Sequence, residues 1–327
     1  NIITRSPLGK PNAMNIAARA GSFDTRDVQV YGNLTDKHMG ITLAANRHLA
    51  DGYRDNNKTR QESLYGDARW KHAASEVILK FGADNQDQRL PGARLVQPSI
   101  GLNQLVTDRE GTSTPLDWAS RNGWQLGLTG NHKLSLGEAT VDLSYRNKDQ
   151  KSYYDFGGFP DYRKSELGML SLSPRIKLLS GSGSVTHEWV AGLDLGRWDY
   201  DLRTSNAPSN IAQPINHVQA EQRNAGLYVR NQIQLNPALG INFGARTEWF
   251  RISAQDSYDA TAPGAFFGSE AEDKQQRERE YAWEIGGRYQ ATPRHVLFAK
   301  AGRSFRFATV DEIYEFTPVF SREFQFL

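Results

Sequence analysis

The chain of 327 residues contains no cysteine. This excludes disulfides, thiolate metal sites and cysteine nucleophiles together, so a small disulfide-stapled scaffold is ruled out. A run of about eighteen or more apolar residues is also lacking, which excludes a transmembrane helix. A chain that crosses a membrane without such helices has to form a closed barrel, because only helices and barrels satisfy every backbone polar group in hydrocarbon.

Neither sign of charge is in excess, because 39 Lys and Arg stand against 37 Asp and Glu, a formal net charge of +2 at pH 7. The charged residues are spread through the chain rather than gathered in a basic tract, so nucleic acid is not an expected partner. Hydrophobic residues make up only 38% of the chain, yet 15 Phe, 13 Tyr and 7 Trp are present. This composition is typical of a wall with one face toward lipid and the other toward water, although a soluble all-β protein also shows it.

Sequence motifs of enzymes are lacking as well. There is no GxSxG elbow and no GxGxxG or GxxxxGK phosphate loop, and the Gly-Ser run at 181–184 indicates a tight turn. The 7 histidines are scattered and never show HExxH spacing. We therefore expect no catalytic residue, no metal site and no cofactor. A barrel enzyme that gathers Asp, His and Ser at its rim from distant strands remains an alternative at this point.

What is present is a period-two pattern, which is typical of strands. Within residues 225–235, Leu227 and Val229 point to one face, whereas Tyr228 and Arg230 point to the other. The pattern resumes after a short turn, so the two segments form a hairpin.

The same pattern predicts about fourteen strands, many of them long enough to cross a bilayer at a tilt. They are expected at residues 13–22, 26–35, 38–50, 60–72, 75–88, 123–134, 138–150, 165–179, 185–204, 218–236, 239–254, 279–292, 294–306 and 321–327.

Short and long connections alternate between these strands. Short ones are expected at residues 36–37, 73–74, 135–137, 180–184, 237–238 and 292–293. Long ones are expected at residues 51–59, 89–122, 151–164, 205–217, 255–278 and 307–320, whereas the connection near 22–25 is brief. A barrel in the outer membrane sorts its loops in this way, whereas a soluble sandwich has no reason to do so.

Aromatic residues lie near strand ends on the apolar face. In a membrane barrel they would form interfacial girdles, and in a sandwich they would be core. The examples are Trp189, Trp249, Tyr281, Trp283 and Tyr289.

Three segments, in the expected order, resemble those of TonB-dependent receptors. Residues 1–5, Asn-Ile-Ile-Thr-Arg, resemble the "VINIITK" run that leads from the plug into the barrel. Residues 48–56 are similar to the "DGYRDN" element that follows an early strand, and residues 302–314 to the "SFRAPTLDELY" element. The resemblance covers essentially the whole chain and implies an all-β, antiparallel up-and-down transmembrane β-barrel.

Receptors of this family have about 22 strands around an N-terminal plug. The resemblance therefore implies that residues 1–6 are the end of the plug and residues 7–327 a partial barrel. We expect both ends to be truncations, so that the TonB box, most of the plug and the closing strands lie outside this chain. The implied partners are TonB, through that absent N-terminal box, and outer-membrane lipid.

The implied function is TonB-dependent import of a scarce nutrient across the outer membrane, most commonly a ferric siderophore. A receptor of the same fold for cobalamin, another cofactor, haem or an oligosaccharide is the first alternative. An unplugged porin-type channel is another, and a soluble secreted binding protein is the third.

Ligand contacts are expected from the longest loops, where aromatic rings beside arginine would hold an anionic, ring-bearing chelate. The competing interpretation is that these side chains only pack the loops or lie at the interface. In the 89–122 loop the candidates are Arg89, Arg94, Arg109 and Trp118. In the 151–164 loop they are Tyr153, Tyr154, Phe156, Phe159, Tyr162 and Arg163.

Overall fold

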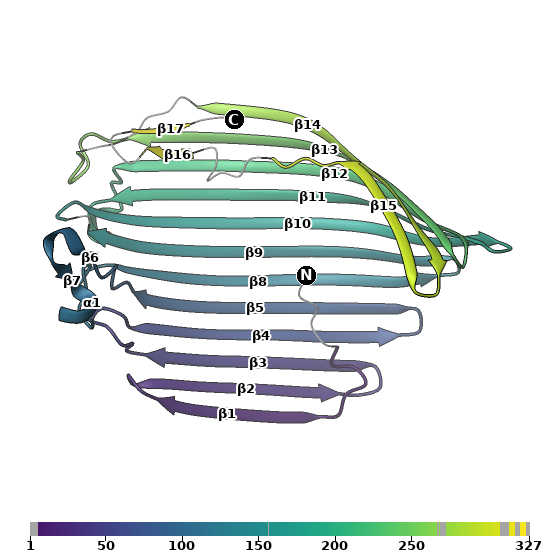
Figure 1. Ribbon diagram of the computed structural model, residues 1–327, viewed down its shortest axis with the longest axis horizontal. Coiled ribbons are helices and arrows are strands. Elements are labelled where there is room, and N and C mark those ends of the chain that lie inside the picture. Colours follow the sequence, from purple (N-terminus) through teal and green to yellow (C-terminus); the bar gives the residue numbers. More distant parts are fainter. Residues whose placement is uncertain are drawn as a thin grey trace.

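A computed structural model of the chain describes residues 6–155, 157–266, 268, 273–307, 314–317 and 321–324. Thirteen strands form one antiparallel sheet whose order follows the chain (Figure 1). The strands of this sheet are β1 (Ala13–Gly21), β2 (Thr25–Thr35), β3 (Met39–Ala50), β4 (Thr59–His72), β5 (Ser75–Arg89), β8 (Trp118–Leu134), β9 (Gly137–Asp155), β10 (Pro160–Ser182), β11 (Val185–Ser205), β12 (Asn216–Asn236), β13 (Leu239–Tyr258), β14 (Lys274–Thr292) and β15 (His295–Arg303).

The remaining elements are short. The connection between β5 and β8 carries β6 (Val96–Gln97), the 3₁₀ turn η1 (Pro98–Ile100), β7 (Leu102–Asn103) and α1 (Gln104–Thr107). A second 3₁₀ turn, η2 (Pro208–Asn210), joins β11 to β12, and β16 (Tyr314–Thr317) pairs with β17 (Ser321–Phe324). Among the described residues, no helix has the length and apolarity needed to cross a membrane.

The strands expected from the period-two pattern are confirmed for the whole of the large sheet. The strand expected at 321–327 was placed wrongly in that sheet, because β17 pairs with β16, which itself lies in a segment expected to be a loop. The loop expected at 151–164 is also wrong, because β9 and β10 continue through most of it and leave only residues 156–159 between them. Aromatic residues favour strands, and Gly157 and Gly158, with φ of +69° and +94°, form the turn.

The sorting of connections by length is confirmed except at the connection between β9 and β10. The short turns, at 36–38, 73–74, 135–136, 183–184, 237–238 and 293–294, lie at one end of the sheet. The other end carries the connections 51–58, 90–117, 206–215 and 259–273, together with the brief turns 22–24 and 156–159 (Figure 1). We call this end the loop rim.

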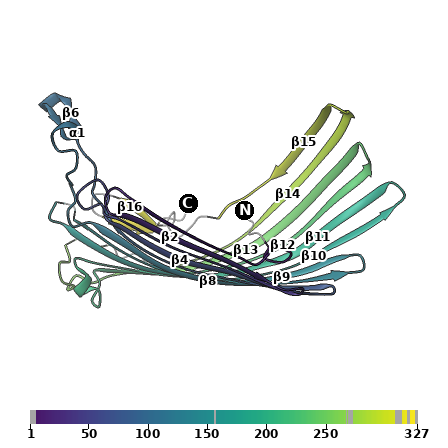
Figure 2. The same ribbon diagram turned by 90° about the horizontal axis from the view of Figure 1, so that it is seen from below.

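The two faces of the sheet differ in chemistry. Figure 2 shows the sheet curved into a trough, with the segment before β1 on the concave side. A Cβ at Gly40 of β3 would lie 3.0 Å from Pro7 in that segment, which identifies the concave face of β3. Strand alternation and the continuous register then assign the faces of every other strand.

The convex face carries a band of large apolar side chains that are exposed. Leu128 of β8, for example, is 43% exposed, and Leu143 of β9 is 42% exposed. The interfacial aromatics predicted from the sequence, Trp189, Trp249, Tyr281, Trp283 and Tyr289, are all exposed as well. An uninterrupted apolar band open to the surroundings is what a lipid-facing wall shows, and a sandwich core would instead bury it.

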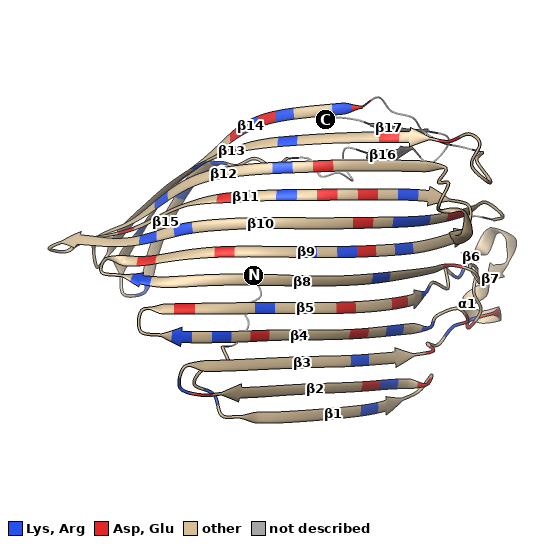
Figure 3. Cartoon of the chain, turned by 180° about the vertical axis from the view of Figure 1, so that it is seen from behind, with Lys and Arg blue, Asp and Glu red and all other residues tan. Residues whose placement is uncertain are grey.

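The strands extend past this apolar band toward the loop rim. In β11, which has 21 residues, the convex face is apolar up to Leu195 and then carries Arg197, Asp199 and Asp201. Figure 3 shows several charged segments of β11 in the half of the strand next to the loop rim. A bilayer core of about 30 Å is shorter than such a strand, so this half lies beyond the hydrocarbon.

Candidate functional site

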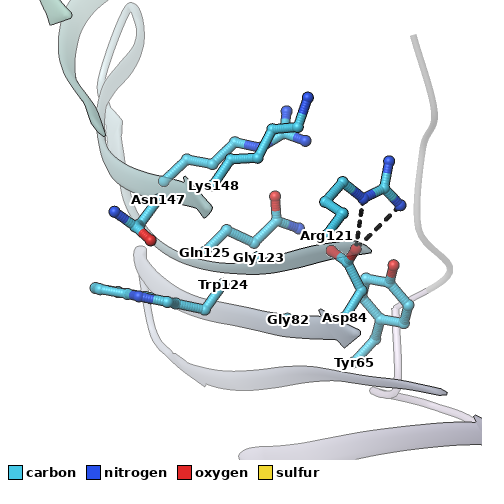
Figure 4. Close-up of a pocket in the computed structure, with 10 residues that line it drawn as sticks. Tyr65, Gly82, Asp84, Arg121, Gly123, Trp124, Gln125, Asn147 and Lys148 are labelled. Carbon is cyan, nitrogen blue, oxygen red and sulfur yellow. Dashed lines mark hydrogen bonds and ion pairs between the residues drawn. The ribbon is translucent and has the colours of Figure 1, made fainter. Parts of the chain in front are cut away.

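A polar pocket lies on the concave face where β4, β5, β8 and β9 run side by side (Figure 4). Alternation along the strands turns Arg121 of β8 and Arg146 and Lys148 of β9 to this face. Asp84 of β5 and Tyr65 of β4 complete its lining. Residues that are far apart in the sequence therefore meet in one recess of the inner wall.

Two glycines make room for the pocket. A Cβ at Gly82 would lie 2.9 Å from Cδ1 of the Tyr65 ring, which covers this glycine. A Cβ at Gly123 would lie 3.1 Å from Oδ1 of Asp84. Larger side chains at either position would push the tyrosine or the carboxylate out of place.

The pocket has an excess of positive charge. The Arg121 guanidinium binds the Asp84 carboxylate, with Nη2 3.1 Å and Nε 3.2 Å from Oδ2 (Figure 4). Within the part of the chain that the structure describes, Arg146 and Lys148 form no ion pair. Their donors are therefore available to an anionic ligand, through charge-assisted hydrogen bonds.

The loop rim above the pocket is organised by the 51–58 connection. Arg54 reaches across to the 90–117 connection, which we call the excursion. Its guanidinium donates to the carbonyl oxygens of Gly92 (Nη1, 2.7 Å), Pro91 (Nη2, 3.0 Å) and Gly111 (Nη2, 3.0 Å; Nε, 3.2 Å). One side chain of the short loop thereby holds both ends of the long one.

Asn56 adds a second clamp. Its side-chain amide donates to the carbonyl oxygens of Leu90 at 3.1 Å, Thr114 at 2.6 Å and Asp117 at 3.0 Å. The backbone of Asn56 has φ of +53°, a left-handed conformation that asparagine tolerates better than most residues. Arg54 and Asn56 both lie in the 48–56 segment, so this motif has a structural role at the loop rim.

A third loop contact lies between the 206–215 and 259–273 connections. The Gln213 amide donates to Oδ2 of Asp259 at 2.9 Å, and the Asp259 amide N–H donates to the Ile215 carbonyl at 3.0 Å. Hydrogen bonds from the Thr261 hydroxyl and then from Gln213 hold the pKa of Asp259 below its ordinary value. The carboxylate of Asp259 therefore stays ionised, and keeps accepting these hydrogen bonds, further into acid than an ordinary aspartate would.

The arginines predicted from the 89–122 loop are dispersed. Arg89 is the last residue of β5 and is exposed on the convex face. Arg94 lies in the excursion, where its side chain is 5% exposed and its Nη2 contacts Asp108 at 2.8 Å. Arg109 stacks over the Tyr53 ring, 5.6 Å from its centroid. The structure does not bring these three side chains together.

The predicted aromatic residues divide between the two faces. Trp118, Tyr153 and Tyr162 occupy one lateral row on the convex face, and the Trp118 and Tyr162 ring centroids are 6.1 Å apart.

The other candidates from 151–164 lie elsewhere. Tyr154 and Arg163 point to the concave face by alternation, and Arg163 pairs with Asp161 at 2.5 Å. Phe159 is 63% exposed in the 156–159 turn, and Phe156 lies outside the described residues. A ligand role for any of these side chains stays a prediction.

The pocket residues were not predicted, because ligand contacts were expected only from the loops. Arg146 and Lys148 lie in a predicted strand, on the face opposite Val141 and Leu143. The alternation that identified this strand also placed both cations on its polar face. Reading the polar face for charge would have found them.

A family model described as "TonB dependent receptor-like, beta-barrel" matches residues 45–323. No curated protein sequence matches the chain.

Solved structures show the same fold. The unliganded ferric citrate transporter FecA has a TM-score of 0.72 at 12% identity, over 88% of this chain and 43% of that one. The siderophore receptor PiuA from Acinetobacter baumannii has a TM-score of 0.70 at 10% identity, over 89% of this chain and 49% of that one. The ferric-catecholate import receptor Fiu from E. coli K12, in its open form, has a TM-score of 0.71 at 12% identity, over 91% of this chain and 55% of that one. The chain thus spans about half the length of the structures it matches.

Proposed function

Because this chain belongs to the TonB-dependent receptor family of β-barrels, we propose that the protein is an outer-membrane transporter that binds and imports a scarce nutrient. The proposed cargo is a ferric siderophore, and the proposed energy-coupling partner is TonB. A plug that fills the lumen, with residues 1–6 as its end, is part of the same proposal. The wall residues described here bind and guide the cargo, and they do no bond chemistry.

The observation that carries the proposal is the cationic pocket on the concave face. Arg146 and Lys148 have no carboxylate partner among the described residues, and Tyr65 offers a ring on the other side of the same pocket. An anionic chelate with aromatic groups would find both charge and a stacking surface there. The similar structures include a ferric citrate transporter and a ferric-catecholate import receptor, which supports an anionic ferric chelate as the cargo class.

Removing the two unpaired cations tests this assignment. We expect the double substitution Arg146→Gln/Lys148→Gln to weaken binding of an anionic ferric chelate by at least roughly a hundredfold, since each cation would donate a charge-assisted hydrogen bond that contributes about 1.5–3 kcal/mol. Binding is measured by fluorescence titration of the purified protein with a panel of ferric chelates of different charge.

A matched control lies on the neighbouring strand. Arg175 and Lys177 of β10 also face the lumen with the same spacing, but each has a carboxylate partner, Asp142 at 2.5 Å and Glu188 at 2.7 Å. The double substitution Arg175→Gln/Lys177→Gln should leave chelate affinity unchanged. Equal affinity for the wild type and the Arg146/Lys148 variant, or an equal loss in both variants, would refute the pocket as the chelate site.

A further inference from the structure

Arginines gather on the convex face of β11–β14, the face opposite the lumen. Register places Arg197, Arg223, Arg251 and Arg277 directly beside one another, one on each strand. All four are exposed, as is Arg279, two residues from Arg277 on β14. Figure 3 shows the corresponding column of blue segments crossing β11, β12, β13 and β14. We call these five residues the arginine patch.

The protein itself neutralises only one side of the arginine patch. Arg197 pairs with Asp199 at 2.9 Å and with Glu221 at 2.8 Å, and Arg223 pairs with Glu221 at 2.6 Å. Like charges on directly opposed positions of neighbouring strands destabilise a sheet, so an uncompensated row of this kind has a cost.

The other side of the arginine patch has no carboxylate partner among the described residues. Arg277 reaches only the Gln275 amide oxygen, 3.4 Å away, and Arg279 stacks on Trp249, 5.1 Å from the ring centroid. No ion pair of Arg251 is found within the same part of the chain. Arg251, Arg277 and Arg279 therefore face outward and can bind an external anion.

The arginine patch also marks the upper edge of the apolar band. Arg197, Arg223, Arg251 and Arg279 are the first residues after the band on the convex faces of their strands, next to Leu195, Ala225, Trp249 and Tyr281 respectively. On β3–β5 and β8–β10, no two adjacent strands both carry arginine at the corresponding position. The residues at this position of β3, β4, β5 and β8 are Arg47, Glu62, Asn85 and Asn122. The concentration of arginine at the band edge is confined to one sector of the sheet.

We propose that the arginine patch binds the phosphate groups of an anionic lipid in the outer leaflet, with its acyl chains lying on the apolar band below. Arginine binds phosphate through paired hydrogen bonds, and the edge of an apolar band is the depth at which lipid phosphates lie. Because neighbouring strands are about 4.8 Å apart, the row spans enough width for a headgroup bearing two phosphates. This proposal rests on the outer-membrane placement in the proposed function, but not on the identity of the cargo.

Lipid retention in detergent micelles tests the proposal. The protein purified from membranes is mixed with bisphosphorylated lipid A or with phosphatidylethanolamine, and native mass spectrometry counts the lipid that stays bound. We expect the wild type to retain the bisphosphorylated lipid selectively. In Arg251→Gln/Arg277→Gln we expect roughly thirtyfold weaker retention, since each basic residue near an anionic surface strengthens binding about fivefold.

The control removes two convex-face arginines from the opposite part of the sheet. Arg47 and Arg60 both contact Glu62 at 3.0 Å, so Arg47→Gln/Arg60→Gln removes the same charge from a compensated site and should retain the lipid fully. Equal retention by the wild type and the Arg251/Arg277 variant, or displacement of the lipid by excess inorganic phosphate, would overturn the proposal. Recovery of the wild type in the aqueous fraction without detergent would instead refute the membrane placement, whatever the arginine patch binds.

Discussion

Replacement of Arg54 by alanine is expected to release the excursion from the loop rim. Its guanidinium donates to three carbonyl oxygens, those of Pro91, Gly92 and Gly111. Hydrogen bonds that involve a charged group contribute about 1.5–3 kcal/mol each, so local opening should become at least roughly tenfold more frequent. Hydrogen exchange over residues 90–117, followed by mass spectrometry, measures this opening.

Two further variants show whether the forked geometry is responsible. Arg54→Lys keeps the charge, but one ammonium does not span three carbonyls, so its exchange should resemble that of Arg54→Ala. Arg109→Ala removes an arginine of the same rim whose described contact is the Tyr53 ring. A cation–π contact at an exposed site contributes only about 0.5–1 kcal/mol, so exchange over residues 90–117 should rise much less than in Arg54→Ala. Unchanged protection of residues 90–117 in Arg54→Ala would contradict the clamp.

The second large effect is expected from adjacent residues on opposite faces of β8. Leu128 is 43% exposed in the middle of the apolar band, whereas a Cβ at Gly127, on the concave face, would meet nothing within 4 Å. An arginine at the bilayer midplane destabilises a barrel by about 2–4 kcal/mol when it faces lipid, whereas a lumen-facing arginine stays hydrated and avoids that desolvation cost. Leu128→Arg should therefore lower the free energy of unfolding by that amount, and Gly127→Arg by much less.

Urea unfolding from liposomes measures both variants under the same conditions. Since the two positions share strand, depth and incoming residue, local strand effects largely cancel in the comparison. A larger loss of stability in Gly127→Arg than in Leu128→Arg would mean that the faces have been assigned the wrong way round.

The strand order could be predicted from the sequence because a lipid-facing strand carries its own signal. In β12, Leu227 and Val229 alternate with Tyr228 and Arg230, and this period appears only when one face is apolar. The signal disappears where a strand leaves the bilayer, since both faces are then polar. The continuation of β9 and β10 through Tyr153 and Tyr162 was missed for this reason.

The sites could not be predicted in the same way, because they depend on register. Asp84 and Arg121 are brought together by pairing of β5 with β8 across an excursion of 28 residues. The arginine patch likewise joins Arg197 to Arg277 through three successive hairpins. A shift of two residues in any of these pairings would keep each strand's apolar face toward lipid but separate these side chains, and the sequence pattern alone does not exclude that shift.

The lipid-facing assignment of the apolar band can be measured residue by residue. Because the chain lacks cysteine, single cysteines at positions 124–130 of β8 can each carry one spin label in the protein reconstituted in bilayers. Collisions with oxygen, which concentrates in lipid, should peak at 124, 126, 128 and 130, and collisions with a water-soluble nickel chelate should peak at 125, 127 and 129. Labels at 126 and 128 that are shielded from both reagents would place these side chains in a dry protein interior and contradict the assignment.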